Sequence, residues 1–168
     1  MSKPSKKKKQ AGLLAEKDMS VEISVMTYGH PLWENTISFA EKCSWKAGTY
    51  LARMMRNKEL SDIERVFVAT EGDAIIGYCT FTIRDELPDD AEYTPFIGFV
   101  FVDEGSRGKR VSERMINAAS DYARSIGYER IYIMSGEQGL YEKYGFVKIG
   151  DFKTRYGTED QLFQKIFR

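Results

Sequence analysis

A short turn rich in glycine and basic residues has the chemistry needed to bind a polyanion. It contains Gly105 and Gly108, which leave the backbone open to close approach, and the basic side chains of Arg107, Lys109 and Arg110. The first amides of a helix lack intrahelical acceptors and lie at the positive end of the helix dipole. A helix that begins in this turn would bind a polyanion, most simply a pyrophosphate, although the same pattern also serves as a plain helix cap.

The segments on either side of the turn would hold it at the end of a buried strand. Residues 99–102 are aromatic or β-branched and apolar, which is typical of such a strand. From Gly108 onward, apolar residues recur at the spacing of one helix face: Val111, Met115, Ala118, Ala119, Tyr122 and Ile126. Gly127 is suited to ending that helix. The sequence therefore predicts a strand, a glycine-bearing turn and a helix, in that order.

The turn resembles the cofactor signature of the GNAT superfamily of N-acetyltransferases. That signature has Gln or Arg, two residues, Gly, one residue and then Gly or Ala, and Arg107 matches its first position. Arg110 stands where the family usually has Gly, and Ser112 stands where it usually has Gly or Ala. Further along, residues 139–146 look like the family element of Tyr, three residues and Gly-Phe. The resemblance covers about residues 20–168.

This resemblance implies a site for acetyl-CoA, with the diphosphate of coenzyme A on the backbone amides of the turn. It assigns to the cofactor the strand residues Val100, Phe101 and Val102 and the turn residues Arg107, Gly108, Lys109, Arg110, Val111 and Ser112. The backbone of the strand would pair with the pantetheine arm in the manner of an added strand. One of its N–H groups would hold the thioester oxygen as negative charge develops on it.

The resemblance also makes Tyr141 the candidate catalytic acid, because it lies four positions before Gly145. A phenol of pKa about 10 can donate to a departing thiol of pKa roughly 8.5 without a large mismatch. The alternative is a tyrosine that only packs, and this is the role we expect for Tyr144. Family members often have a Glu on the central strand, but residues 94–97 contain no carboxylate. Deprotonation of the acceptor through ordered water is therefore preferred to a single carboxylate.

Two segments are candidates for the acceptor site. In the family, the helices that follow the first strand form one wall of this site, which implicates Trp33, Glu34 and Trp45. Asp90 and Glu92 belong to a loop dense in carboxylates, which would attract a cationic amine. The competing interpretations are a helix core with its solvated face and a solvated surface loop.

Periodic patterns along the chain predict an α/β (α+β) fold. Strands are expected over residues 21–28, 64–69, 74–84, 94–102, 130–134, 146–154 and 162–167, and helices over 33–43, 45–57, 108–126 and 138–144. A strand–helix–strand crossover makes the strands around the long helix parallel, whereas the second and third strands and the final two are expected to form hairpins. We therefore expect a GNAT-like mixed, mostly antiparallel sheet of six to seven strands with flanking helices.

The composition limits the other classes of function. The chain has 168 residues, and its 25 basic and 25 acidic residues cancel, which argues against nucleic acid as a partner. Apolar runs suited to a membrane helix or a signal peptide are lacking. Together with only two cysteines, Cys43 and Cys79, this favours a reducing, cytoplasmic location. The single histidine, His30, has no companion, so no metal site is expected.

The predicted organisation is a basic tail over residues 1–19 and an acetyltransferase domain over residues 20–168. The predicted function is an acyl-CoA N-acyltransferase that moves acetyl from acetyl-CoA to a primary amine by direct attack in a ternary complex. The acceptor would be a small-molecule amine or a peptide or protein amine, and a homodimer is compatible with the sequence. The alternatives are a different short acyl group, a catalytically weak coenzyme A-binding regulatory domain, and nucleic-acid binding through the lysine-rich tail.

Overall fold

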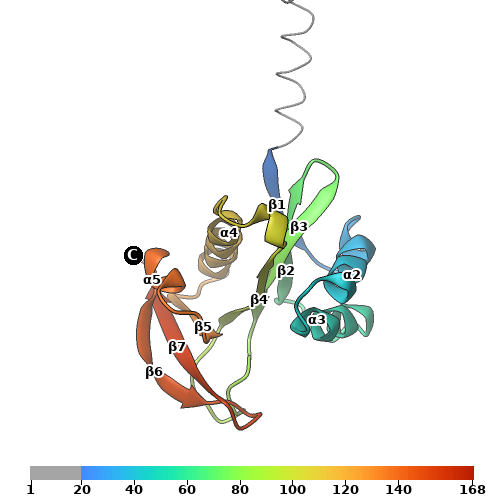
Figure 1. Cartoon of the computed structure of the whole chain (residues 1–168). Coiled ribbons are helices and arrows are strands. Elements are labelled where there is room, and N and C mark those ends of the chain that lie inside the picture. Colours follow the sequence, from blue (N-terminus) through green and yellow to red (C-terminus); the bar gives the residue numbers. More distant parts are fainter. Residues whose placement is uncertain (1–19) are drawn as a thin grey trace, which may run out of the picture.

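The computed structural model describes residues 20–168, so the lysine-rich tail lies outside the described residues. The chain forms a seven-stranded sheet in the order β1-β2-β3-β4-β5-β7-β6 (Figure 1). The strands are β1 (Val21–Met26), β2 (Arg65–Glu71), β3 (Ala74–Thr82), β4 (Phe96–Val102), β5 (Arg130–Ser135), β6 (Val147–Lys153) and β7 (Glu159–Ile166). The helices are α2 (Trp33–Lys42), α3 (Ala47–Arg56), α4 (Val111–Ser125) and α5 (Leu140–Lys143). The predicted mixed sheet with flanking helices is confirmed.

The pairing of the strands follows their connections. β4 and β5 are parallel because α4 crosses between them, and every other neighbouring pair is antiparallel. The final strand, β7, lies between β5 and β6. The two last strands form the expected hairpin. The pairing of β7 with β5 joins that hairpin to the rest of the sheet.

Two hydrophobic clusters cover the two faces of the sheet. α4 packs on one face, where Phe67 and Met115 are fully buried, and α2 and α3 pack on the other, where Leu51 and Val68 are fully buried (Figure 1). Phe67 and Val68 are neighbours in β2 and point to opposite faces, as successive strand residues must. The near-continuous apolar run of β2 is thus explained by burial on both sides.

The central strand β4 separates from β5 along most of its length. The two strands, both within residues 20–168, pair only at Phe96 and Tyr132. On its other edge, β4 has a bulge in which Phe99 and Val100 both lie opposite Cys79, and Phe99 has a φ of 48°. Beyond Phe96, the edge of β4 that faces β5 therefore has no strand partner within the described residues.

α4 begins later than the pattern predicts. The sequence places its start at Gly108, whereas the first helical residue is Val111. Gly108 has a φ of 82° and Arg110 a φ of 61°, and neither value is compatible with a right-handed helix. The turn is therefore left-handed at two positions, of which only one is a glycine.

Candidate active site

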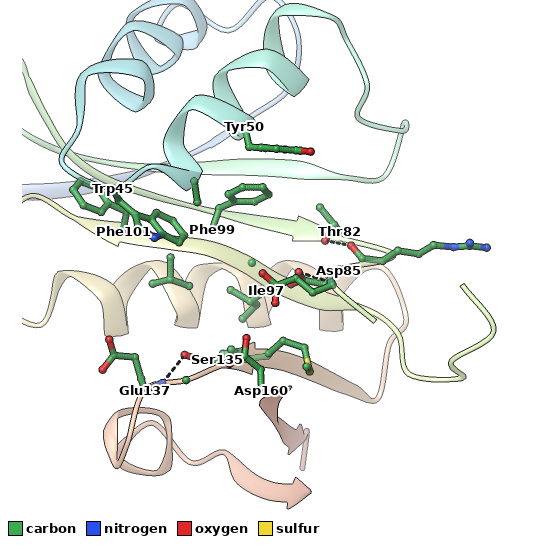
Figure 2. Close-up of a pocket in the computed structure, with 18 of the residues that line it drawn as sticks. Trp45, Tyr50, Thr82, Asp85, Ile97, Phe99, Phe101, Ser135, Glu137 and Asp160 are labelled. Atoms are coloured by element: carbon green, nitrogen blue, oxygen red, sulfur yellow. Dashed lines mark hydrogen bonds between the residues drawn. The ribbon is translucent and has the colours of Figure 1, made fainter. Parts of the chain in front are cut away.

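Two adjoining cavities open where β4 and β5 diverge. The larger has a volume of about 820 Å³ and the smaller about 670 Å³. Both walls include the same residues from β4, from the turn before α4 and from the segment after β5: Val100, Phe101, Arg107, Glu137 and Tyr141. The cavities therefore meet along this shared boundary. Figure 2 shows the larger one.

The smaller cavity brings together nearly all the residues that the sequence assigns to the cofactor. Its wall includes the strand residues Val100, Phe101 and Val102 and the turn residues Arg107, Gly108, Arg110, Val111 and Ser112. Lys109 is the exception, because it does not line this cavity and its Nζ lies 3.9 Å from a carboxylate oxygen of Glu71. A Cβ added to Gly108 would meet no atom within 4 Å, so the backbone of the turn is open to a ligand.

The two arginines of the turn have different surroundings. Arg107 Nε donates to the carbonyl oxygen of Val102 at 3.0 Å, and its guanidinium carbon lies 5.8 Å from the centre of the Phe101 ring. These contacts fix Arg107 at the boundary of the two cavities. The Arg110 side chain is exposed and lies 3.7 Å from the carboxylate of Glu113. The guanidinium of Arg107 is thus kept in place by its contacts at the cavity boundary, whereas the side chain of Arg110 extends toward solvent.

Tyr144 contacts the turn from the other side of the smaller cavity. Its hydroxyl lies 2.9 Å from that of Ser112, in the first turn of α4. Its carbonyl oxygen accepts a hydrogen bond from Lys165 Nζ at 3.0 Å. The packing role expected for Tyr144 therefore includes a hydroxyl contact with a predicted cofactor residue.

Tyr141 lies at the meeting point of the cavities and is almost completely buried, with 4 % of its surface exposed. Its ring packs against Phe146 and Phe163. Burial raises the pKa of Tyr141 to about 12, and the nearby Ser135 hydroxyl only partly offsets this. This value is higher than the ordinary one assumed from the sequence. The phenol therefore stays protonated at neutral pH, and its O–H group is available to donate a hydrogen bond.

The acceptor residues predicted on the first helices are only partly brought to the cavity. Trp33 has 6 % of its surface exposed, lies in the core and packs edge-on against Tyr28 with ring centres 4.9 Å apart. Glu34 is exposed on α2 and lies outside both cavity walls. The structure does not bring these two residues to either cavity, because the start of α2 faces the core and solvent. Trp45, just before α3, does line the larger cavity.

The acidic loop contributes different carboxylates from those expected. Asp90 and Glu92 are exposed and lie outside both cavity walls, whereas Asp85, Glu86 and Asp89 line the larger cavity. The reason is that the chain after β3 folds back over β4. The first residues of the loop therefore face the cavity, and the later ones face solvent.

Asp85 is the functional candidate that the sequence interpretation missed. Its Oδ1 accepts a hydrogen bond from the Glu86 amide at 2.8 Å, and its Oδ2 would lie 2.9 Å from a Cβ built on Gly98 of β4. Burial raises the pKa of Asp85 to about 7, with further contributions from the carboxylates of Glu86 and Asp160. The sequence signal that could have identified Asp85 was its position shortly after the strand that pairs with β4.

Arg155 joins the acidic loop to the hairpin of β6 and β7. Its backbone N–H donates to the Glu86 carbonyl at 2.7 Å, and its Nη2 donates to the Leu87 carbonyl and the Asp89 carboxylate, each at 3.0 Å. These contacts bring Tyr156 and Asp160 of the hairpin into the same wall. Arg155 therefore sets the position of the loop that carries Asp85.

The opposite wall of the larger cavity is aromatic. Trp45 stacks on Phe101 with ring centres 6.2 Å apart and meets Phe99 edge-on at 6.3 Å. Tyr50 of α3 is half exposed beside them. Figure 2 shows these aromatic rings on one side of the cavity, with Asp160 on the other. The larger cavity thus places carboxylates opposite aromatic faces, an arrangement suited to a cation.

Among residues 20–168, no three or more His, Cys, Asp or Glu side chains are grouped so as to hold a metal ion. Over the same residues, no helix has the length and apolar character that crossing a membrane requires.

Comparison with known proteins identifies the family. The fold matches an aminoglycoside 6'-acetyltransferase type Ii at a TM-score of 0.68 and 17 % identity, covering 86 % of this chain and 96 % of that one. An aminoglycoside 6'-N-acetyltransferase complexed with coenzyme A matches at 0.65 and 14 %, covering 86 % and 96 %. A GNAT family acetyltransferase from Elizabethkingia anophelis with acetyl-CoA bound matches at 0.60 and 16 %, covering 88 % and 98 %.

At these identities, the solved structures show a shared fold. A search of curated proteins gave no match. The model of the acetyltransferase (GNAT) family matches residues 32–146, which span both the turn before α4 and the Tyr141 element. The chain therefore belongs to the GNAT family of acetyltransferases.

Proposed function

We propose that the chain transfers an acetyl group from acetyl-CoA to a primary amine by direct attack in a ternary complex. The observation that carries this proposal is the meeting of the two cavities at Tyr141. In this arrangement the smaller cavity holds the donor and the larger cavity holds the acceptor. The coenzyme A and acetyl-CoA named for two solved structures of the same fold support this choice of donor.

The residues of the smaller cavity fit coenzyme A. The open backbone at Gly108 and the small side chain of Ser112 allow a diphosphate to approach the first amides of α4. Arg107, whose side chain is positioned by its hydrogen bond to Val102, adds a positive charge. The edge of Val100–Val102 that faces β5 has no strand partner in the described chain, so it is available to pair with a pantetheine arm. Acetyl-CoA supplies the acetyl group as an activated thioester.

The chemistry then divides between two side chains. Asp85 takes the proton that the amine nitrogen loses as its bond to the acetyl carbon forms, and the pKa of Asp85 near 7 suits a base at neutral pH. Tyr141 donates a hydrogen bond to the sulfur as the carbon–sulfur bond breaks. A backbone N–H of Val100–Val102 stabilises the negative charge that develops on the acetyl oxygen.

Calorimetry tests the donor site directly. Coenzyme A should bind at least about tenfold more tightly than pantetheine, because only coenzyme A carries the phosphates that contact the turn. Equal affinities would contradict the assignment of the smaller cavity to the phosphates.

Release of free thiol from acetyl-CoA, measured over a panel of small amines and of peptides with a free amine, tests the transfer itself. Thiol release that depends on an amine supports the proposal. Coenzyme A binding without thiol release over the whole panel would instead favour a regulatory domain that binds coenzyme A. The observation that favours such a regulatory domain is the left-handed conformation of Arg110, at a position where the family usually has Gly.

A further inference from the structure

A buried glutamine of β7 binds the chain segment that follows β5. Gln161 has 6 % of its surface exposed, and its Nε2 donates to the carbonyl oxygen of Ser135 at 3.2 Å and to that of Glu137 at 2.9 Å. Its backbone lies opposite Ser135 in the pairing of β5 with β7. A buried amide bound to two nearby carbonyl groups fixes the course of the backbone between them. Gln161 therefore holds Ser135 and Glu137 in the wall of the larger cavity.

The segment held by Gln161 also binds to itself through the Ser135 side chain. The Glu137 amide donates to Ser135 Oγ at 3.1 Å, and Figure 2 shows this bond as a dashed line. Because the bond occupies a lone pair of the serine oxygen, the serine O–H remains free to donate elsewhere.

The Ser135 hydroxyl acts in turn on Tyr141. Burial raises the pKa of Tyr141, and a hydrogen bond with the Ser135 hydroxyl opposes this rise. A bond that opposes the rise is one that the phenol oxygen accepts, since such a bond favours the ionised form. The hydrogen bonds therefore run in one direction, from the Glu137 amide through Ser135 to the oxygen of Tyr141.

The same face of β7 holds the ring of Tyr141. Phe163 lies two residues after Gln161, so the two side chains point to one face of the strand. The Phe163 ring packs against that of Tyr141 with ring centres 5.5 Å apart. β7 thus positions the ring of Tyr141 through Phe163 and the neighbour of its hydroxyl through Gln161.

The direction of these bonds decides where the Tyr141 proton points. A phenol oxygen that accepts from Ser135 has its own O–H left for a different acceptor. Tyr141 lines both cavities at their boundary, so a ligand at the boundary can be that acceptor. Hydrogen bonds in series polarise one another, which makes the last O–H a better donor.

We propose that Gln161 and Ser135 are positioning residues for the transfer, and that they direct the O–H of Tyr141 toward the sulfur of the thioester. This inference rests on the proposed function, because it assigns roles to two further residues in the same reaction. Neither residue gives or takes a proton in that reaction. Gln161 acts by fixing the segment after β5, and Ser135 acts by donating to the phenol oxygen.

A double-mutant cycle with Tyr141→Phe tests this inference, with thiol release from acetyl-CoA as the measurement. Ser135→Ala should lower kcat by about three- to tenfold, the effect of one net hydrogen bond, and leave the KM for acetyl-CoA within about twofold of the parent. Gln161→Met keeps the length of the side chain without its donors and should lower kcat at least as much. In the Tyr141→Phe background, each substitution should change kcat by less than about twofold, because the hydroxyl through which it acts is absent.

Two variants serve as controls. Ser135→Thr keeps the hydroxyl and should retain the kcat of the parent. Gln164→Met changes a glutamine of the same strand that lies outside both cavity walls, and it should also retain this kcat. If Gln161→Met folds poorly, Ser135→Ala carries the test alone, since it removes one oxygen atom at the cavity wall.

Equal losses of kcat with Tyr141 and with Tyr141→Phe would overturn the inference, because Ser135 and Gln161 would then have a structural role only. An unchanged kcat in Ser135→Ala would do the same. Either result, obtained with a parent that releases thiol, contradicts this inference and leaves the proposed function standing.

A parent that releases no thiol with any amine would contradict the proposed function. The inference is then tested by the fluorine resonance of Tyr141 in protein labelled with 3-fluorotyrosine, assigned by its absence in Tyr141→Phe. A resonance that moves on addition of coenzyme A in the parent, but not in Ser135→Ala, would support the inference. Any other behaviour of the two resonances would contradict it.

Discussion

The hydroxyl oxygens of Ser112 and Tyr144 lie 2.9 Å apart and connect the first turn of α4 to the residue that follows α5. The two residues come from the two sequence elements that carry the family resemblance, 32 positions apart. Their contact holds one side of the smaller cavity, whose wall includes the first residues of α4. The proposed phosphate site therefore depends on a residue outside the turn.

We expect Tyr144→Phe to weaken coenzyme A binding by about three- to tenfold, which corresponds to one net hydrogen bond. The ring packing stays, so the change reports the hydroxyl alone. Calorimetry measures the effect. Tyr156→Phe is the control, since Tyr156 lines only the larger cavity, and it should leave this affinity unchanged. An unaltered affinity in Tyr144→Phe would mean that the contact with Ser112 does not support the site.

Arg110→Gly should stabilise the protein by about 0.5–1 kcal/mol, because Arg110 has a φ of 61° and glycine adopts this conformation without strain. Coenzyme A affinity should stay within about tenfold of the parent, since the backbone amide makes the contact. Urea unfolding and calorimetry measure the two effects. Lys58→Gly is a matched control with a φ of 53°, at the end of α3 and away from both cavities. It should give a similar gain in stability, and loss of coenzyme A binding in Arg110→Gly alone would show that the guanidinium holds a phosphate.

Tyr141→Phe should lower kcat by roughly 10–100-fold and leave coenzyme A affinity unchanged. The effect lies at or below the low end of what a general acid contributes. A pKa of about 12 makes the buried phenol a poor proton source for a thiolate, although it can still donate a hydrogen bond. For the same reason, the alkaline side of the pH profile below pH 10 should be the same in parent and variant. Full activity in Tyr141→Phe would leave the residue with a packing role only.

Asp85→Asn should lower kcat by roughly 10²–10⁴-fold and remove the loss of activity on the acid side of the profile. In the parent, kcat should fall as the pH drops below about 7, because the Asp85 carboxylate must be ionised to accept the proton. The groups acting on it are Glu86, Asp160 and Arg155, and the last of these lowers its pKa. A pH profile of the same shape in parent and variant would exclude Asp85 as the base.

Asp85 should also make the stability of the fold depend on pH. The protonated carboxyl favours the folded state, whereas the ionised carboxylate is the form needed for activity. The pKa of Asp85 in the folded state, about 7, lies above the unfolded value of roughly 3.9. Its protonated form therefore stabilises the fold at low pH, and this contribution is lost as the pH rises through 7. Asp85→Asn should raise the melting temperature more at about pH 8 than at about pH 5. Equal shifts at both pH values would indicate that the folded-state pKa is not raised.

Arg155→Ala should lower kcat/KM for the acceptor by about tenfold or more, with little change in coenzyme A affinity. The guanidinium donates to Leu87 and Asp89, so its loss frees the loop that positions Asp85. Arg84→Ala is the matched control, because Arg84 also lies 3.0 Å from Asp89 but is largely exposed. Equal effects of the two substitutions would show that the charge on Asp89, and not the position of the loop, controls the acceptor.

The sequence alone determined the secondary-structure elements of this protein and the residues of the turn before α4. Apolar periodicity located the strands and helices to within a few residues, because local side-chain patterns decide which faces are buried. That Arg107, Gly108 and Ser112 share one cavity wall was also predictable, since they are close in the chain. Only the left-handed Arg110, which delays α4 to Val111, was not evident from the pattern.

The tertiary structure decided which residues line the larger cavity. Asp85, Gly98 and Asp160 come from separate segments of the chain and line the same cavity because β4 separates from β5 and β7 is inserted beside β5. The exposure of Asp90 and the burial of Trp33 likewise depend on which way a loop or helix turns against the sheet. Contacts between distant segments carry no local signal in one sequence, so the composition of the acidic loop could predict a charge but not which carboxylate faces the cavity.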